Sequence, residues 1–534
     1  MKKAMLKKNF IKNIMIELLF ISLFFRIVSA NPAITDSLNA LISVDTKREC
    51  IKYNKMIFGQ FIEHFHKQIY GGIYDPSSKF SDEKGFRTDV IEALKELHVP
   101  VVRWPGGCFA SSYHWLDGVG PKRKSSFDKA WRVEDSNQFG TDEFVEWCRK
   151  INAEPYICTN AGTGTQEEMS DWVEYCNLTD EGRYAQLRQS NGYRNPHNVK
   201  YWSIGNENYG WWEIGAKTVD EWGDFVLESA KMMRSVDPSI QLFAAANYDL
   251  DWTLNLIRTA GRQLDYISIH GYYDRLQQKN EPSDYLTCMT KTIIPERQIR
   301  RVEQLISIAG FEDKIHIAFD EWNLRSWHHP GHGTNDRPID EMVAARDKNS
   351  LDQTYTMADA VFSACFLNTC LRHAKKVKMA NMSPVVNTRG PIHVHSSGIV
   401  KRTTFHVLKM YSNLLAPYVV DAYIQSDSLE HKNISFPVFD AIVTCDSDWR
   451  RISMMLVNKH PNRSVSCSIV IDGRKIEGSY QTILLSGDSP DVYNDIEHQD
   501  NVVPVEHKMT FNRGKVDLPP HSIISWTLSY QVDD

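Results

Sequence analysis

Eight short apolar runs, separated by stretches with helical periodicity, constrain the fold of this 534-residue chain more than any other feature of its sequence. The runs are Met56–Phe61, Val99–Arg103, Glu154–Thr159, Val199–Ile204, Gln241–Ala245, Tyr266–His270, Ile315–Phe319 and Lys378–Met382. Helical stretches between them include Arg87–His98, Asp220–Val236 and Thr354–Ala374. Parallel strands joined by crossover helices produce this alternation, and eight such units match the size of a (β/α)8 barrel with enlarged loops. We therefore predict an α/β fold with a TIM barrel over residues 56–410.

The pattern changes in the last part of the chain. Runs rich in β-branched residues replace the helical periodicity, with turns between them, as in Ser464–Ile471, Tyr480–Ser486 and Ser522–Tyr530. Such runs are typical of an antiparallel sandwich, so we predict an appended C-terminal β-sandwich domain over residues 411–534. The N-terminal segment 31–55 contains one more strand-like run, Leu38–Thr46, and we expect it to add to that sandwich.

Residues 1–30 have the organisation of a secretory signal peptide. Five lysines precede the apolar run Ile14–Phe25, and the segment closes on small residues at Ala30. The run is too short to span a bilayer and Glu17 interrupts it, so a membrane anchor is the weaker interpretation. We expect an exported protein, periplasmic or extracellular. The net charge of −6 offers no basic face for nucleic acid or anionic lipid.

Two carboxylates follow barrel runs that are distant in sequence. The fourth run leads into Glu207 and the seventh into Glu321. In such barrels the active site gathers at the C-terminal ends of the strands, and the fourth and seventh strands face one another. A single Glu after a strand is often only a polar loop residue, but two facing carboxylates are the equipment for cleaving a glycosidic bond. A separation of about 5 Å predicts retention and about 6.5–9.5 Å inversion, which sequence leaves open. The apolar wall of Trp211 and Trp212 should keep Glu207 protonated.

Other run ends bring further candidates to the barrel mouth. The first run leads into Glu63 and His64, and the sixth ends at His270, with Tyr272 two residues later. The glycines of "RWPGGCF", after the second run, should bring backbone close to a ligand. We interpret the histidine-rich segment Trp327–Gly333 as a loop that contacts substrate, because its spacing matches no metal-ligand motif. We predict no metal and no other cofactor, since paired carboxylates need none.

Longer motifs resemble those of the α-L-arabinofuranosidases of glycoside hydrolase family 51, in the family's order and over nearly the whole mature chain. They are "FGQFIEHFHKQIYGGIYDP", "VVRWPGGCFASSYHWLDGVGP", "SNQFGTDEFVEWC", "YWSIGNENYG", "DYISIHGYY" and "AFDEWN". The resemblance implies hydrolysis of terminal non-reducing α-L-arabinofuranosyl residues from arabinan, arabinoxylan or related oligosaccharides. It also implies retention through a covalent glycosyl-enzyme, with Glu207 as general acid and base and Glu321 as nucleophile.

The resemblance extends to binding residues. It implies that Asn206 holds the sugar 2-hydroxyl, that Glu63 and Cys108 bind other hydroxyls, that Tyr272 positions the nucleophile, and that Trp131 lines the pocket. We add His270, at the end of the sixth run, as a candidate substrate contact.

One position departs from the family. Where many members carry a glutamine after the eighth strand, this chain has Pro384, whose side chain forms no hydrogen bond. We expect Asn387 or Arg389 to build that part of the subsite instead.

Three alternatives stay open at this point. The same two carboxylates could serve an endo-glucanase or β-xylosidase, which would need a groove open at both ends rather than a pocket; long insertions such as Gly331–Asp347 favour a walled pocket. The barrel could be a non-catalytic sugar-binding protein, since aromatic walls serve recognition as well. The sandwich itself could bind polysaccharide. The oligomeric state is also open, a homo-oligomer included.

Overall fold

The computed structural model describes residues 38–530, apart from 275, 277–280, 327–337 and 347–354. The described residues from Asn39 onward belong to one compact unit. The predicted signal peptide and the histidine-rich segment Trp327–Gly333 lie outside the described residues, as does part of the insertion Gly331–Asp347.

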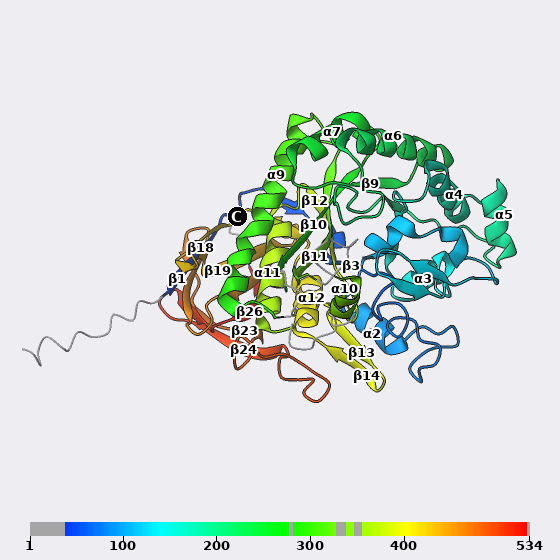
Figure 1. The fold of residues 1–534 in the computed structure, drawn as a ribbon. Coiled ribbons are helices and arrows are strands. Elements are labelled where there is room, and N and C mark those ends of the chain that lie inside the picture. The colour runs from blue at the N-terminus through cyan, green and yellow to red at the C-terminus, as the bar shows by residue number, and fades with distance from the viewer. Residues whose placement is uncertain (1–37, 275, 277–280, 327–337, 347–354, 531–534) are drawn as a thin grey trace, which may run out of the picture. The chain divides into compact units, whose positions relative to one another are not determined.

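Eight parallel strands close into a barrel in the order β3-β4-β7-β8-β9-β10-β11-β12 (Figure 1). They are β3 Gly59–Phe61, β4 Val101–Trp104, β7 Glu154–Thr159, β8 Tyr201–Ile204, β9 Gln241–Ala245, β10 Tyr266–Asp274, β11 His316–Arg325 and β12 Val377–Met382. Each predicted run contributes one strand, so the (β/α)8 barrel is confirmed. The first strand starts late because Lys55–Phe58 form a 3-10 turn.

Two barrel strands are longer than their apolar runs. β10 continues to Asp274 and β11 to Arg325, so His270 and Glu321 lie inside strands, opposite one another in the pairing of the two. The pairing of β11 with β12 shifts between Phe319 and Trp322. Such an irregularity lets two successive residues turn to the same side of a sheet, which the ordinary alternation forbids. Asp320 and Glu321 can therefore both face the barrel interior.

Helices surround the barrel. They are α2 Thr88–Glu96, α3 Thr141–Lys150, α4 Gln166–Asn177, α5 Arg183–Ser190, α6 Val219–Val236, α7 Leu250–Ala260, α8 Tyr285–Thr290, α9 Ile294–Ile308, α10 Ile339–Arg346, α11 Met357–Arg372 and α12 Thr403–Leu414. Helix α6 starts at a capping box, where Thr218 and Glu221 bond each other's backbone N–H groups. Helix α11 is buried on all sides because it packs against β11 and against the C-terminal sheets.

The C-terminal region consists of two main antiparallel sheets. One has the order β16-β1-β21-β22, with β25 beside β21, and the other β2-β15-β19-β20-β26-β23-β24. Their strands are β1 Leu38–Val44, β2 Cys50–Lys52, β15 Tyr418–Val420, β16 Tyr423–Ser426, β19 Phe439–Cys445, β20 Arg451–Asn458, β21 Val465–Ile471, β22 Arg474–Lys475, β23 Gly478–Leu485, β24 Val505–Phe511, β25 Lys515–Leu518 and β26 Ser522–Ser529. The N-terminal segment supplies β1 and β2. The predicted limits of the domains stay predictions.

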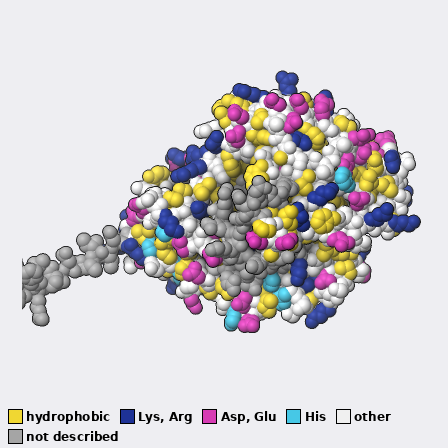
Figure 2. All heavy atoms as spheres, in the orientation of Figure 1, with side chains coloured by type: hydrophobic (Ala, Val, Ile, Leu, Met, Phe, Trp, Pro, Cys, Tyr) yellow, Lys and Arg dark blue, Asp and Glu magenta, His cyan; other side chains and the backbone are white. Residues whose placement is uncertain are grey.

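Three small two-stranded sheets complete the architecture. They are β5 Ser126–Asp128 with β6 Val133–Asp135, β13 Ile392–His395 with β14 Gly398–Lys401, and β17 Ser428–His431 with β18 Ile434–Pro437. Within the described ranges, no helix is both long and apolar enough to cross a membrane. On the face in Figure 2, acidic and basic side chains are interspersed.

Candidate active site

A cavity of about 690 Å³ lies at the C-terminal ends of the barrel strands. Seven of the predicted site residues line it: Glu63, Cys108, Trp131, Glu207, His270, Tyr272 and Glu321. Asn206, the eighth, is buried and does not belong to this lining. The fold thus gathers side chains from five barrel strands or the loops that follow them at one place.

Glu207 and Glu321 meet in this cavity. An oxygen of each carboxylate and a ring nitrogen of His270 lie within 4.8 Å of one another. The strands that carry the two glutamates, β8 and β11, lie three places apart around the ring. Two carboxylates at this separation can both reach the anomeric carbon and glycosidic oxygen of one bound sugar.

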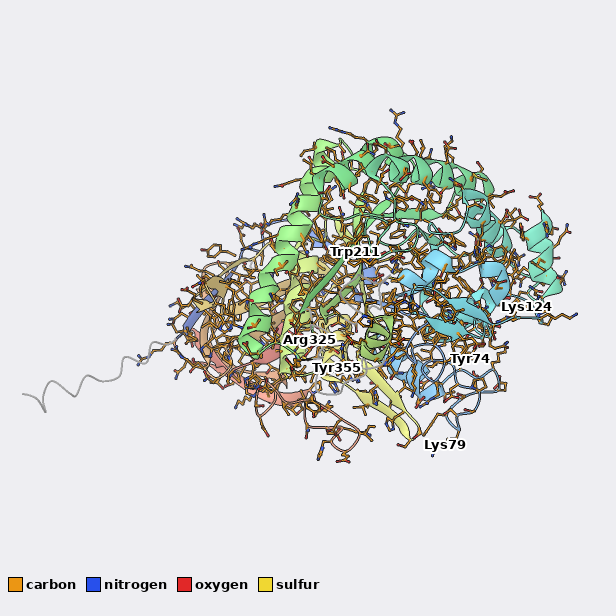
Figure 3. All side chains as sticks on the ribbon, in the orientation of Figure 1. Tyr74, Lys79, Lys124, Trp211, Arg325 and Tyr355 are labelled. Carbon is orange, nitrogen blue, oxygen red and sulfur yellow. The ribbon has the colours of Figure 1, made fainter. Side chains whose placement is uncertain are left out.

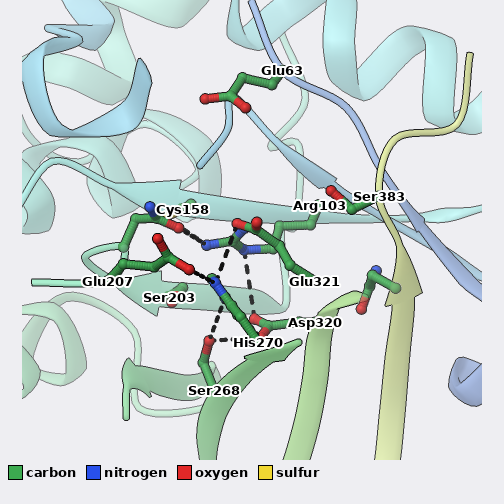
Figure 4. A network of polar contacts seen from close by, with 12 residues as sticks. Glu63, Arg103, Cys158, Ser203, Glu207, Ser268, His270, Asp320, Glu321 and Ser383 are labelled. Carbon is green, nitrogen blue, oxygen red and sulfur yellow. Dashed lines mark hydrogen bonds and ion pairs between the residues drawn. The ribbon is translucent and has the colours of Figure 1, made fainter. Parts of the chain in front are cut away.

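Glu321 is held from both sides by hydrogen-bond donors. Arg103 Nη1 donates to Glu321 Oε1 at 2.6 Å (Figure 4). The Tyr272 hydroxyl donates to Oε2 at 2.7 Å. The Tyr272 oxygen also lies 2.8 Å from Ser383 Oγ. With 4% of its side chain exposed and both oxygens engaged, Glu321 has a defined orientation.

Arg103 is the centre of a buried network beneath the cavity. Besides Glu321, its guanidinium donates to Asn206 Oδ1 at 2.8 Å, and its Nε lies 3.5 Å from Asp320 Oδ2. Asp320 also accepts hydrogen bonds from Tyr156 and Ser268. Burial raises the pKa of Asp320, but the charge of Arg103, the hydrogen bond and charge of His270 and the hydrogen bond from Ser268 together leave that pKa below its ordinary value.

His270 links the two glutamates. Its Nδ1 lies 2.8 Å from Glu207 Oε1 and 3.6 Å from Glu321 Oε1, and its Nε2 lies 3.4 Å from Asp320 Oδ1. Burial lowers the pKa of this imidazole, yet the charge of Glu321 and the bonds to Asp320 and Glu207 raise it to about 10. The ring is therefore an imidazolium at neutral pH.

Glu207 lies in the turn after β8, not in a strand. Its backbone has φ of +43°, a left-handed conformation that few non-glycine residues adopt. His270 Nδ1 donates to Oε1 at 2.8 Å and Trp212 Nε1 donates to Oε2 at 2.8 Å. The Tyr209 hydroxyl lies 3.4 Å from Oε1. The strained turn thus aims the carboxylate into the cavity, among aromatic donors.

The expectation that Trp211 and Trp212 keep Glu207 protonated is wrong for this structure. Burial does raise the pKa of Glu207, but the hydrogen bond and charge of His270, followed by the bond from Trp212, hold the pKa below its ordinary value. Trp212 uses its N–H and not its apolar face, and Trp211 is 69% exposed. An indole N–H donated to a carboxylate favours the charged form.

Glu63 has one engaged oxygen and one free for a ligand. Oε1 accepts from Phe109 N at 2.9 Å and from Trp131 Nε1 at 2.8 Å, whereas Oε2 is buried without a hydrogen-bond partner among the described residues. Burial and the charge of Glu321 raise the pKa of this carboxyl well above its ordinary value. A neutral acid in this position can donate to, or accept from, a sugar hydroxyl.

The two glycines of "WPGG" make room for Glu63. A Cβ at Gly106 or Gly107 would lie 2.8–2.9 Å from the Glu63 side chain, which is closer than packed atoms approach. Gly107 also lines the cavity, as predicted for a glycine near a ligand. The glycines therefore serve the carboxylate as well as the ligand.

The remaining predicted residues are Trp131 and Cys108, in the wall of the cavity, and Asn206, which is buried behind it. Trp131 stacks on Phe65 with ring centroids 3.8 Å apart, which fixes the indole plane beside Glu63. Burial raises the pKa of the Cys108 thiol well above its ordinary value, so Cys108 is a neutral polar group. Asn206 turns its oxygen to Arg103, which leaves its NH2 group to act as a donor.

His64 lies behind the cavity, not at its mouth. Its Nδ1 bonds Asp135 Oδ2 at 2.8 Å, its Nε2 accepts from Trp104 Nε1 at 2.8 Å, and its ring stacks on Phe109. Both ring nitrogens are thus used inside the protein. The prediction that His64 lies at the barrel mouth is wrong.

The residues near Pro384 also differ from expectation. Asn387 donates to the Lys67 carbonyl and accepts from Val394 N, so its side chain serves the loop. Arg389 is buried, and neither residue lines the cavity. On other sides the cavity is lined by Asn247, Tyr248, Gln298 and Ser326, which sequence reasoning did not single out.

Sequence reasoning missed two further site residues. Arg103 was noted only as the end of an apolar run, although an arginine inside a barrel strand must be paired and is a signal in itself. Glu213, six positions after Glu207, lies outside the motifs that the sequence analysis uses. It is 3% exposed and its carboxyl lies within 4.8 Å of atoms of Cys108 and Glu207.

Among the residues that the structure describes, two groups of side chains have the spacing of metal ligands. They are Cys108, Glu207 and Glu213, and Glu207, His270 and Glu321. In the second group His270 donates its Nδ1 proton to Glu207 and so offers no lone pair there. The donor set fits a hydrogen-bonded acid pair better than an ion. The predicted histidine cluster at 327–333 lies outside the described residues.

The similarity of this chain to known proteins covers both the barrel and the C-terminal region. Two family models match: the alpha-L-arabinofuranosidase 1 domain over residues 93–289 and the alpha-L-arabinofuranosidase C-terminal domain over residues 320–522. Alpha-L-arabinofuranosidase C of Emericella nidulans is 35% identical over 512 residues, which cover 90% of this chain and 96% of that protein.

Another relative and a solved structure show the same similarity. An intracellular exo-alpha-(1->5)-L-arabinofuranosidase of Halalkalibacterium halodurans is 34% identical, covering 91% of this chain and 94% of that protein. The structure of a thermostable GH51 alpha-L-arabinofuranosidase from Thermotoga petrophila matches with a TM-score of 0.81 at 32% identity, covering 92% of this chain and 100% of that one. The similarity therefore spans both the barrel and the C-terminal sheets.

Proposed function

The chain belongs to the α-L-arabinofuranosidases of glycoside hydrolase family 51 and acts at non-reducing ends; on that premise we propose that it works by double displacement with retention of the anomeric configuration. The observation that carries this proposal is the close approach of the Glu207 and Glu321 carboxylates, within 4.8 Å. Retaining enzymes separate their carboxyl groups by about 5–5.5 Å, which leaves no room for the water that inversion needs.

In the first step Glu321 attacks the anomeric carbon while Glu207 protonates the departing oxygen. Arg103 and Tyr272 aim the Glu321 oxygens. The C–O bond to the leaving group breaks as the bond to Glu321 forms, and the covalent glycosyl-enzyme results. In this proposal the Asn206 amide, whose oxygen accepts from Arg103, donates to the sugar 2-hydroxyl as positive charge develops on the ring.

The proton for this step comes from His270. In the unliganded protein the imidazolium shares a 2.8 Å hydrogen bond with the Glu207 carboxylate, so the pair already holds one proton. Transfer of that proton to Glu207 gives the acid, and its transfer to the leaving oxygen restores the carboxylate. In the second step water attacks the glycosyl-enzyme, Glu207 takes the water's proton, and His270 recovers it.

The substrates that fit are arabinan, arabinoxylan and related arabino-oligosaccharides. The relative from Halalkalibacterium halodurans is named an exo-acting enzyme on α-(1->5) linkages. In this chain Trp211, labelled in Figure 3, lines the cavity with 69% of its surface exposed. It packs edge-on against Trp212, which donates a hydrogen bond to Glu207. Because the leaving oxygen must reach Glu207, the next sugar lies on this side, where an exposed indole can stack on its apolar face.

The stereochemical course tests the mechanism. Hydrolysis of an aryl α-L-arabinofuranoside, followed by proton NMR during the first minutes, should show α-L-arabinofuranose as the first product. First release of the β-anomer would mean inversion and would refute double displacement. Products from arabinoxylan, linear arabinan and branched arabinan would then rank the natural substrates.

We also propose that residues 1–30 direct export. The support is the sequence alone: lysines, an apolar stretch and a small-residue site at Ala30. The family does not decide the compartment, since one relative is named intracellular. N-terminal sequencing of the protein made by its own host should begin at Asn31 and the protein should leave the cytoplasm; an intact Met1 would contradict this.

A further inference from the structure

A further buried carboxyl, Glu213, lies behind the wall of the cavity. Ser111 Oγ donates to its Oε1 at 2.5 Å, and Asn206 Nδ2 lies 3.4 Å from its Oε2. Cys108 Sγ and an oxygen of Glu207 are within 4.8 Å of it. Glu213 therefore touches two of the residues that bind the sugar and lies beside the general acid.

No cationic side chain among the described residues forms an ion pair with Glu213. The two positive groups of the network, Arg103 and His270, are directed to Glu321, Asp320, Asn206 and Glu207. None of the ion pairs formed by the described residues includes Glu213. A carboxyl buried without a positive partner favours its neutral form.

The groups that face Glu213 act on it in opposite directions. Burial and the negative charges of Glu207 and Glu321 raise the pKa of Glu213, while hydrogen bonds from Ser111 and Cys108 lower it; together they bring it to about 8. The carboxyl is therefore uncharged at neutral pH and becomes charged in the mildly alkaline range.

We propose that Glu213 is a positioning residue of this active site: its neutral carboxyl leaves the Asn206 amide free to hold the sugar 2-hydroxyl, and its ionised form draws that amide away. The reason is geometric. Arg103 occupies the oxygen of Asn206, so the NH2 group must divide its two protons between Glu213 Oε2 and the substrate. An ionised acceptor forms the stronger hydrogen bond and wins this competition. The proposal rests on the role of Asn206 in the proposed function.

The test uses kcat/KM for an aryl α-L-arabinofuranoside with a good leaving group. Such a substrate needs little protonation by Glu207, so loss of the Glu207 proton does not mask other ionisations. Wild-type kcat/KM should fall as pH rises through about 8. In Glu213→Gln, whose amide mimics the neutral acid, activity at pH 6 should stay within about threefold and the fall should move up by about one pH unit or more.

Two variants sharpen the result. Ser111→Ala removes a hydroxyl that favours the charged form of Glu213. The fall of kcat/KM in this variant should therefore also move to higher pH, but by less than in Glu213→Gln. Glu228→Gln, an exposed position on α6, is the matched control and should keep the wild-type profile. A profile of Glu213→Gln that coincides with the wild type, or a wild type that shows no fall below pH 9, would overturn the proposal. Absence of any hydrolysis by the wild type would instead refute the proposed function.

Thermal unfolding gives a second readout that needs no activity. Because the pKa of Glu213 is raised on folding, the folded state keeps a proton that the unfolded chain loses above about pH 4.5, so stability falls between that pH and 8. The stability of Glu213→Gln lacks this decrease with pH, because its amide does not ionise. Its Tm should therefore rise relative to the wild type from pH 5 to pH 8, and a constant difference would contradict the proposed neutral carboxyl.

Discussion

The two ends of the cavity hold their carboxylates in different ways. Glu321 lies within strand β11, is 4% exposed along its side chain, and receives a cationic and a phenolic donor. Glu207 lies in a turn with positive φ, is 13% exposed, and receives its donors from His270, Trp212 and Tyr209.

The difference follows from what each group must do. A nucleophile needs one fixed orientation, which a strand and the hydrogen bonds from Arg103 and Tyr272 supply. A general acid and base changes its charge twice in each turnover, so it needs a partner that exchanges protons, and His270 is such a partner. Each prediction below tests whether the two ends differ in this way.

The largest effect is expected for Glu321→Ala. Without the nucleophile no glycosyl-enzyme forms, and kcat/KM for an aryl α-L-arabinofuranoside should drop by about 10⁴-fold or more. Circular dichroism and the Tm should be measured beside it, because loss of the buried carboxylate leaves Arg103 without one partner. Unchanged activity in a folded variant would exclude the assigned role.

Glu207→Ala should affect substrates unequally. Oligosaccharides, whose leaving group needs a proton, should lose about 10²- to 10⁴-fold in kcat/KM, whereas an aryl substrate with a good leaving group should lose much less in the first step. The measurement is a series of aryl leaving groups of different pKa. An equal loss across the series would mean that Glu207 is not the acid, and the contrast between the two ends would disappear.

Tyr272→Phe should weaken the Glu321 end alone. It removes the 2.7 Å hydrogen bond to Glu321 Oε2 and little volume. A hydrogen bond to a charged group is worth about 1.5–3 kcal/mol, so kcat should fall roughly 10- to 150-fold with little change in KM. Tyr209→Phe is the matched control at the Glu207 end, where the contact is 3.4 Å and the loss should be smaller.

His270→Gln should change how stability depends on pH. The pKa of His270 rises to about 10 in the folded protein, from about 6.5 in an unfolded chain. A histidine whose pKa is raised on folding stabilises the folded protein fully at pH values below its pKa in the unfolded chain. This stabilisation is lost as the pH rises through its pKa in the folded protein. The free energy of unfolding of the wild type should thus exceed that of His270→Gln most at pH 6 and converge toward pH 10 in urea titrations.

The smallest effect is expected for Trp211→Ala. Loss of stacking by an exposed indole should raise KM for arabino-oligosaccharides roughly 2- to 10-fold and leave kcat/KM for a small aryl substrate unchanged. Equal effects on both substrates would place Trp211 in the arabinose site itself, or in the fold, and not beside the next sugar.

Sequence reasoning reached the barrel and its two glutamates because both depend on local patterns. Apolar runs of strand length alternate with helical periodicity, and the carboxylates follow those runs directly. Sequence reasoning failed where contacts with a distant segment of the chain decide the length of a strand or the position of a side chain. The lengthened β10 and β11, the placement of His64 behind the cavity, and the internal bonds of Asn387 each depend on contacts between segments that are far apart in the chain.

The sequence by itself determined which strands form and which acidic residues reach the mouth of the barrel, because hydrophobic periodicity and strand ends depend on residues that are neighbours along the chain. Only the tertiary structure decided the charge state of each acid. Glu207 and Glu213 lie six positions apart in one loop, yet the pKa of the first is lowered and that of the second raised. The reason is that burial penalises both charges, while only Glu207 has the imidazolium of His270 beside it.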